Sequence, residues 1–318
     1  MPAARRRLPT GDLLALLTIS IWSLNVIVVK IALRDVPPLV YTATRFLAGG
    51  LLLAGALRLR GRLAPMRRSD LGAFALAGLF GIAANQLAFT FALQHTSAVD
   101  VSLILGSTPL LVAGWQAGRM RERIGPRAWL GLGVGAAGLA MVVAGGGSSH
   151  GALAGDLLAL AAAAMFTLYL DRLVRLLPHC PALPLSAWVT LLGAVELVPL
   201  GIGEGAVAHP HWTWPVAGLL VYSSVLAVAV GNSAYYGGIQ LLGATRAAVY
   251  TYLQPFLGAM FGVVILGEAL RPIQLAGGVV IIAGVVGGRP RAVPVSTQQQ
   301  VLPEHQASEA AQLTARSG

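Results

Sequence analysis

The chain repeats one sequence pattern at a constant offset. Several features of residues 97–131 recur 146 residues later: Ser97-Ala98 as Gly243-Ala244, Pro109 as Pro255, Glu122 as Glu268, Pro126 as Pro272, and Gly131 as Gly277. The hexapeptide GDLLAL at residues 11–16 also recurs at residues 155–160, an offset of 144. An internal repeat determines the architecture of a chain. We therefore predict that the chain consists of two copies of one ancestral unit. The offsets of 144 and 146 differ because the two copies differ in length by two residues between the two matched stretches.

The composition places both halves in a membrane. The 318 residues are 56% hydrophobic and 11% charged, whereas an ordinary soluble domain has about 25% charged residues. A membrane-spanning helix needs about 20 apolar residues, and ten runs of about that length are present: 12–33, 38–58, 71–93, 97–118, 128–144, 156–177, 184–203, 215–239, 246–267 and 272–288. The predicted fold class is an all-α integral membrane protein with ten transmembrane helices. They form two five-helix repeats. Because each repeat has an odd number of spans, the second repeat enters the membrane from the opposite side, and the two repeats are inverted.

The predicted organisation follows from these runs. A cytoplasmic N-terminal tail (1–11) precedes the first repeat (12–144), and a glycine-rich periplasmic linker (145–155) precedes the second repeat (156–288). The polar segment 289–318 is expected to be a disordered cytoplasmic tail.

The net charge of +10 has a topological explanation. With a cytoplasmic N-terminus, 18 of the 22 Lys and Arg residues fall on the cytoplasmic side, while Arg34 and Arg271 fall outside and Lys30 and Arg45 lie within spans. This asymmetry is the positive-inside pattern of membrane proteins. We therefore expect both termini in the cytoplasm, a lipid bilayer as the partner of the basic loops, and no nucleic-acid binding.

Polar and aromatic side chains recur at matched depths in the two halves. Trp22 and Asn25 share one helix face, and Phe166 and Tyr169 occupy the corresponding positions of the second half. An amide in a membrane span requires a partner helix or a water-filled cavity, so interhelical hydrogen bonding is the alternative to a binding role. The candidate substrate-binding residues are Trp22, Asn25, Asn85, Tyr169, Asn232, Tyr235 and Gln254.

Two prolines lie at the centres of corresponding spans. Pro109 follows Gly106, Ser107 and Thr108, and Pro255 follows Gln254. Proline removes a helical hydrogen bond and clashes with the preceding turn. Interrupted helices at corresponding positions of two halves indicate the central site of a transporter, so helix kinks are expected at Pro109 and Pro255.

Arg45 lies too deep in the second span to reach the membrane surface easily. A buried Arg is a functional-site hypothesis that needs a partner. Glu196 is the carboxylate predicted at similar depth, so the two could form a structural ion pair or take part in proton coupling. Alternatively, Arg45 binds backbone carbonyl groups at the ends of spans.

The sequence offers no arrangement typical of an enzyme. It lacks a phosphate-binding loop, a Ser-His-Asp set and paired carboxylates at a plausible depth. The single cysteine, Cys180, excludes an intrachain disulfide and a thiolate metal cluster, and the pair His209 and His211 lacks further ligands. We expect no catalytic residues, no metal and no cofactor.

The chain resembles EamA-type members of the drug/metabolite transporter superfamily over residues 11–288. The resemblance rests on Trp22 with Lys30, Arg45-Phe46, Thr96-Ser97-Ala98 with Pro109 and Glu122, and Pro255 with Leu266-Gly267-Glu268. Two residues depart from the family pattern: Arg121 replaces a usual Gly, and Arg246 replaces a small residue. The resemblance implies ten helices around a central cavity and export of amino acids or related metabolites across the bacterial inner membrane.

The function expected from the sequence is secondary transport of a small-molecule substrate by alternating access, most simply amino-acid export. A permease for drugs, nucleosides or sugars is the alternative, as is a membrane sensor or assembly subunit that transports nothing. Proton-coupled antiport would need a titratable carboxylate within the membrane, and Glu196 is the one candidate. If Glu196 instead pairs with Arg45, facilitated export down the gradient of the solute is expected, and we favour this uncoupled mechanism. The sequence leaves substrate identity, direction and oligomeric state open.

Overall fold

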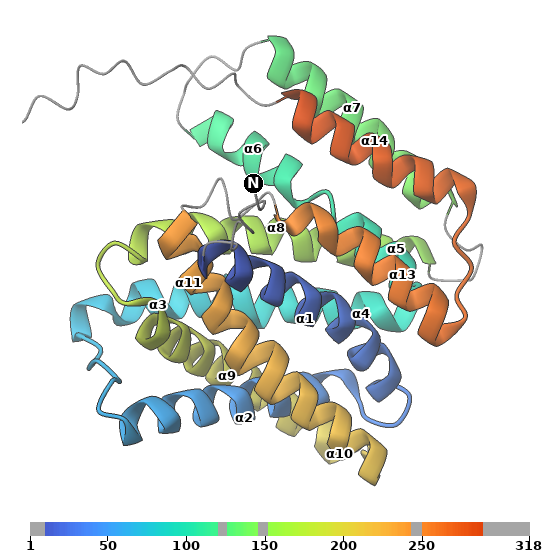
Figure 1. The fold of residues 1–318 in the computed structure, drawn as a ribbon. Helices are drawn as coiled ribbons and strands as arrows, with labels where there is room; N and C mark the ends of the chain where they lie inside the picture. Colours follow the sequence, from blue (N-terminus) through green and yellow to red (C-terminus); the bar gives the residue numbers. More distant parts are fainter. Residues whose placement is uncertain (1–9, 120–125, 146–151, 243–249, 289–318) are drawn as a thin grey trace, which may run out of the picture.

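The computed structural model describes residues 10–119, 126–145, 152–242 and 250–288, and every regular element in these ranges is helical (Figure 1). Six helical segments are long and apolar enough to cross a membrane: Thr10–Ala32, Pro38–Leu59, Arg68–His95, Ala152–Leu176, Ala182–Val207 and Trp214–Leu242. The fourth, fifth, ninth and tenth expected spans appear as shorter apolar helices. The all-α membrane class is therefore confirmed, and the length criterion supports six of the ten expected spans.

The helices of the two halves follow the same plan. The first half has α1 (Thr10–Ala32), α2 (Pro38–Leu59), α3 (Leu71–Gly78), α4 (Asn85–His95), α5 (Ala98–Leu105), α6 (Thr108–Arg119) and α7 (Pro126–Gly145). The second half has α8 (Ala152–Leu176), α9 (Ala182–Val207), α10 (Trp214–Val221), α11 (Asn232–Leu242), α13 (Gln254–Leu266) and α14 (Pro272–Gly288). Helix α6 corresponds to α13, and α5 corresponds to residues 244–251, most of which lie outside the described ranges. Prolines begin α2, α7 and α14, where the missing N–H costs no helical hydrogen bond.

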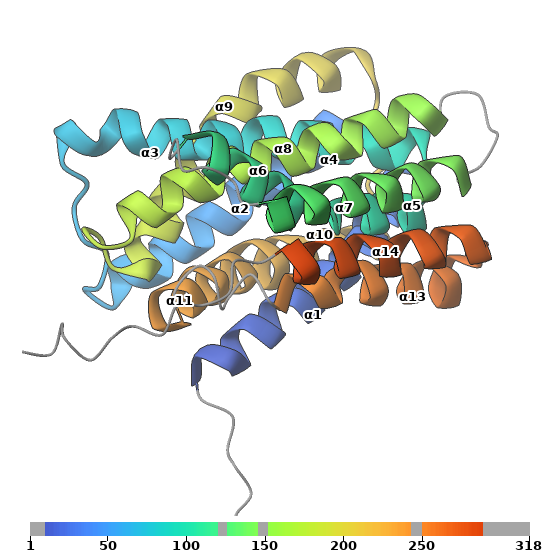
Figure 2. The same ribbon diagram turned by 90° about the horizontal axis from the view of Figure 1, so that it is seen from above.

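The second, fourth and fifth spans of the two halves pack on their counterparts, whereas the first and third spans exchange partners. Helix α2 packs on α9, α5 on α13, and α7 on α14, while α1 packs on α11 and α4 on α8. The first helix of each half therefore lies against the third span of the other half. Figures 1 and 2 show α7 and α14 side by side at the edge of the bundle. This exchange of partners places both halves around the same central space.

The third span of each half contains a stretch of π-helix. Leu79–Ala84 connects α3 to α4, and Tyr222–Gly231 connects α10 to α11. Each stretch ends directly before an asparagine, Asn85 or Asn232. Because π-helical turns are rare and frequently mark functional sites, their recurrence at corresponding places singles out this level of the bundle.

The expected kinks are breaks between helices. Helix α5 ends at Leu105 and α6 begins at Thr108, so Pro109 is the second residue of α6. In the second half a short 3-10 helix, Thr251–Leu253, precedes α13, whose second residue is Pro255. Proline fits the first turn of a helix but not its interior. The chain is therefore interrupted at the same level in both halves.

Two glutamates of the second half cap helices of the first half. Glu204 Oε2 accepts hydrogen bonds from the backbone amides of residues 39 and 40, at 2.7 and 3.1 Å. The Glu268 carboxylate accepts hydrogen bonds from the amides of residues 98 and 99, at 3.0 and 2.9 Å. A carboxylate at a helix N-terminus satisfies free N–H groups and complements the helix dipole. These contacts fix the halves to each other at one end of the bundle.

Candidate functional site

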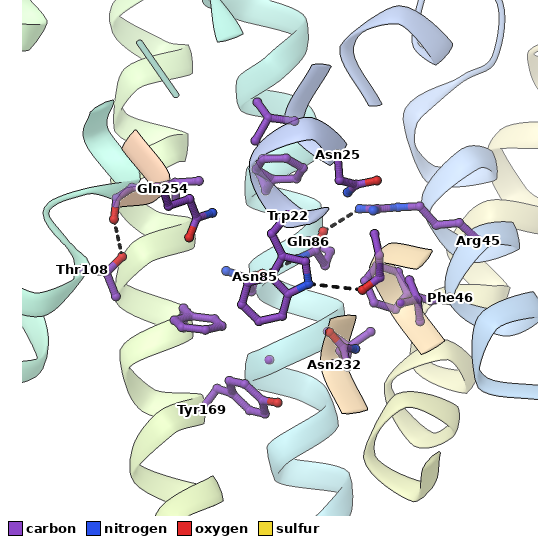
Figure 3. A pocket seen from close by; sticks show the side chains of 18 of the residues that line it. Trp22, Asn25, Arg45, Phe46, Asn85, Gln86, Thr108, Tyr169, Asn232 and Gln254 are labelled. Carbon is purple, nitrogen blue, oxygen red and sulfur yellow. Dashed lines mark hydrogen bonds between the residues drawn. The ribbon is translucent and has the colours of Figure 1, made fainter. Parts of the chain in front are cut away.

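A cavity lies between the two halves at the level of the helix breaks (Figure 3). Its empty volume is about 910 Å³, including the space at its open mouth. Its lining comes from both halves: Trp22, Asn25, Val26, Arg45, Phe46, Gly81, Ile82, Asn85, Gln86, Phe89, Leu105, Thr108, Phe166, Tyr169, Ala227, Val228, Asn232, Thr251 and Gln254. The wall therefore combines aromatic rings with amide and hydroxyl groups.

Six of the seven candidate substrate-binding residues line this cavity. They are Trp22, Asn25, Asn85, Tyr169, Asn232 and Gln254. The seventh, Tyr235, is buried beside Trp22, with ring centroids 4.9 Å apart, and is not part of the lining. Tyr235 therefore supports the Trp22 ring instead of facing the cavity.

An aromatic group forms one wall. The Trp22 ring meets Phe166 edge-on, with centroids 6.1 Å apart, and Phe166 contacts Tyr169 at 5.4 Å. Trp22 Nε1 donates a hydrogen bond to the Ala227 carbonyl oxygen at 3.1 Å, within the π-helical stretch of the second half. The indole is held by packing and by a hydrogen bond, so its orientation is fixed before a ligand arrives.

A chain of hydrogen bonds connects three of the helices around the cavity. Arg45 Nη2 donates to Gln86 Oε1 at 2.5 Å, and Gln86 Nε2 donates to Asn85 Oδ1 at 2.6 Å. Asn85 Nδ2 in turn donates to the Ala162 carbonyl oxygen at 2.8 Å. Figure 3 shows Arg45 reaching from α2 toward Gln86 on the neighbouring helix. This chain orients the two amides and joins α2, α4 and α8.

Other amides of the cavity have few hydrogen-bond partners among the described residues. Asn25 Oδ1 accepts a hydrogen bond from Ser223 Oγ at 2.6 Å, and Asn232 Nδ2 makes one long contact of 3.5 Å with Thr190 Oγ1. Within the described ranges, the Asn25 NH₂ group and the Gln254 side-chain amide have no hydrogen-bond partner. Groups of this kind can fix the orientation of a polar ligand in an otherwise apolar site.

The structure does not place Arg45 and Glu196 in an ion pair, as far as the described residues show. Glu196 lies on α9, outside the cavity lining, and its Oε2 atom is buried without a hydrogen-bond partner among the described residues. No described backbone carbonyl accepts a hydrogen bond from Arg45 either. Depth in the membrane was the basis for pairing the two residues, and depth does not determine which way a helix faces.

Sequence reasoning omitted several lining residues from the site. Gln86 directly follows Asn85, and Phe166 occupies the position of the second half that corresponds to Trp22, so both had a detectable signal. Thr108 and Thr251 lie next to the two helix breaks. Their positions beside Pro109 and Pro255 could have indicated that they face the same space.

The described residues contain no group of three or more His, Cys, Asp or Glu side chains arranged to hold a metal ion. The charge on the described lining comes from Arg45 alone. This arrangement suits recognition of a polar solute through hydrogen bonds and ring contacts.

Proteins from several organisms are similar to this chain. A protein of Archaeoglobus fulgidus described as an uncharacterized transporter is 28% identical over 279 residues, covering 86% of this chain and 95% of that protein. The protein YedA of Escherichia coli K12, described as an uncharacterized inner membrane transporter, is 28% identical over 300 residues, covering 89% of this chain and 91% of that protein. A probable terminal-alkyne amino-acid exporter of Streptantibioticus cattleyicolor is 27% identical over 272 residues, covering 85% and 90%.

A solved crystal structure has the same fold. It aligns with a TM-score of 0.62 at 23% identity, covering 87% of this chain and 95% of that chain. The family match is more specific, because two stretches of this chain, residues 9–144 and 153–287, each match the EamA-like transporter family. Both repeats carry the family pattern, and the chain belongs to the EamA-like transporter family.

Proposed function

We propose that this protein is a secondary transporter that exports amino acids or related small metabolites by alternating access. The observation that carries the proposal is a cavity with polar and aromatic walls, lined by both halves at the level where their helices break. Transporters built from inverted repeats bind substrate at the interface between the repeats, beside interrupted helices. Membership of a transporter family supports the same conclusion and argues against an enzyme.

The proposed architecture has ten spans in two inverted repeats, residues 12–144 and 156–288. Both termini are on the cytoplasmic side of a bacterial inner membrane. Rocking of one repeat against the other would open the cavity alternately to each side. The shorter helices of each half, α5 with α6 and α13, are the segments that would change their contacts with the cavity.

The proposed binding residues are Trp22, Asn25, Asn85, Tyr169, Asn232 and Gln254, with Tyr235 behind Trp22. Amides would bind the polar groups of the solute, and aromatic rings would contact its apolar or cationic part. The relative named as a probable terminal-alkyne amino-acid exporter supports amino-acid-like solutes. A drug, nucleoside or sugar would need the same kinds of group, so the solute class is decided by transport assays.

We propose transport without proton coupling, down the gradient of the solute. A coupling carboxylate is expected to face the substrate or a water-filled path. Glu196 is outside the cavity lining, which favours a structural role for it on α9. A response of transport to an imposed pH gradient, abolished by Glu196→Gln, would contradict this part of the proposal.

The binding site is tested with the two asparagines that follow the π-helical stretches. Counterflow of labelled amino acids is measured in proteoliposomes with the wild type, Asn85→Ala, Asn232→Ala and Gln94→Ala. Gln94 is an exposed amide on α4, the helix that carries Asn85, so its substitution is the matched control. We expect at least a tenfold loss for each asparagine variant and none for the control. Unchanged counterflow in both asparagine variants would show that the site is wrong.

A further inference from the structure

Arg45 combines full burial with a position on the cavity wall. It has 1% of its surface exposed and lies on α2 among the lining residues. Moving an isolated charge out of water is expensive unless it is paired and hydrogen-bonded. The position of Arg45 therefore requires a compensating partner.

The protein supplies only part of that compensation. Of the five N–H groups of a guanidinium, one donates to the neutral Gln86 side chain at 2.5 Å. The Phe46 ring lies 4.7 Å from the Arg45 Cζ atom and the Tyr41 ring lies 6.0 Å away. Arg45 Nε is buried without a hydrogen-bond partner among the described residues. No described carboxylate reaches the guanidinium.

The rest of the described lining provides no negative charge to balance Arg45. Its polar members are the amides of Asn25, Asn85, Gln86, Asn232 and Gln254 and the hydroxyl groups of Thr108, Thr251 and Tyr169. A planar guanidinium matches the geometry of a carboxylate and binds it through two parallel hydrogen bonds. An anionic ligand would therefore supply the missing partner.

We infer that the transported solute carries a carboxylate group and that Arg45 binds it. This inference rests on the proposed transport function and names the substrate class of the same cavity. One guanidinium balances one negative charge, which fits a monocarboxylate better than a phosphate dianion. A solute with a net charge of −1 neutralises the cavity, whereas a zwitterion leaves one positive charge in it. N-acylated amino acids and other amino-acid-like monocarboxylates are the favoured solutes.

The aromatic wall accommodates the body of such a solute. Trp22, Phe166 and Tyr169 form a continuous group of rings, and Figure 3 shows Trp22 and Tyr169 on the cavity, with Arg45 entering it from a different helix. A carboxylate held by Arg45 would leave its side chain free to contact these rings. Recognition would then combine one charge-assisted contact with apolar contact area.

The test compares probes that differ in net charge but share one amino-acid side chain. Binding of N-acetyl-L-phenylalanine, L-phenylalanine and L-phenylalaninamide to the full chain in lipid nanodiscs is measured by calorimetry, together with the corresponding alanine series. We expect the wild type to bind the N-acetyl carboxylate best and the amide at least tenfold more weakly. Arg45→Gln is expected to lose this preference. Arg60→Gln, which removes an exposed charge at the end of the same helix, is expected to retain it.

A second variant keeps Arg45 in place. Gln86→Glu puts a carboxylate where the Gln86 amide oxygen now lies, 2.5 Å from Arg45 Nη2, and satisfies the guanidinium from within the protein. It is expected to fold at least as stably as the wild type and to lose at least tenfold in affinity for the carboxylate probes. This variant tests the inference even if Arg45→Gln does not fold.

Two binding results would overturn the inference. One is a wild type that binds none of the carboxylates, or binds the amides equally well. The other is a Gln86→Glu variant that keeps the full carboxylate preference. Counterflow of neutral or cationic solutes by the same protein would preserve the transport proposal while refuting the role of Arg45. Absence of any counterflow would refute the transport proposal separately.

Discussion

The close packing of α7 on α14 gives a stability prediction with an internal control. A Cβ atom added at Gly138 of α7 would lie 2.6 Å from the Ile281 backbone nitrogen and 2.7 Å from the Gly277 carbonyl oxygen, both on α14. Atoms of a backbone cannot rotate away as a side chain does, so Gly138→Ala must push the two helices apart. At Gly133, also on α7, an added Cβ meets nothing within 4 Å.

The magnitude follows from two opposing effects. Replacing Gly by Ala in a helix favours folding by about 1 kcal/mol at either position. Overpacking at Gly138 costs about 1–3 kcal/mol, and membrane helices depend on close packing because lipid offers no hydrophobic drive for their association. We therefore expect Gly138→Ala to be less stable than Gly133→Ala by about 1–3 kcal/mol, a difference of a few degrees in melting temperature.

Thermal unfolding of the purified full chain in detergent, followed by tryptophan fluorescence, measures this difference. Gly133→Ala should melt at or slightly above the wild type, and Gly138→Ala below both. If Gly138→Ala melted as high as Gly133→Ala, α7 and α14 would not be packed through their backbones, and the pairing of corresponding helices would be wrong at this position.

Three further outcomes are expected. Gly81→Ala should lower the melting temperature by a few degrees, because the new Cβ would lie 2.4 Å from a Tyr169 ring carbon; an unchanged melt would refute this contact. Glu268→Gln should destabilise the chain by about 1 kcal/mol, since it weakens the charged cap of α5; equal unfolding curves in denaturant would contradict that role. Burial, and then the charge of Asp70, raises the pKa of the Cys180 thiol in the α8–α9 connection. Less thiolate is therefore present at neutral pH, so alkylation by iodoacetamide should be slow at pH 7 and still accelerate above pH 9; a rate that levels off below pH 8 would disprove the shift.

The repeat and the composition predicted the fold class because both features are long-range and redundant. GDLLAL and the paired prolines occur in both halves, so one misread position could not change the conclusion. The interruption near Pro109 was also predictable, since Gly106, Ser107 and the proline all disfavour a continuous helix. The sequence did not show that this interruption is a two-residue turn between α5 and α6.

The π-helical stretches could not be predicted from the sequence. Leu79–Ala84 and Tyr222–Gly231 have ordinary apolar compositions. In a π-helix the backbone hydrogen bonds join residues five apart instead of four, and this change does not require particular residue types. These stretches change which side chains of the third spans face the cavity. A helix face assigned with a period of 3.6 is therefore unreliable beyond such a stretch.

The direction of individual side chains was the other limit. Tyr235 has the chemistry of a lining residue, yet it packs behind Trp22. Arg45 and Glu196 are expected at a similar depth from the sequence, yet they face different surroundings. Span depth follows from hydropathy, whereas rotation about the helix axis is set by packing against neighbouring helices. The residue types of the candidate site were predictable for this reason, and their pairing was not.

The most direct test of a transport cavity between the two halves is counterflow by the wild-type protein in proteoliposomes. Labelled amino acids, their N-acetyl derivatives, nucleosides and sugars are offered with and without an imposed pH gradient. We expect saturable counterflow of one class, the amino-acid-like carboxylates, that does not depend on the gradient. A folded protein that moves no solute across this panel would contradict the account and favour a sensor or assembly subunit.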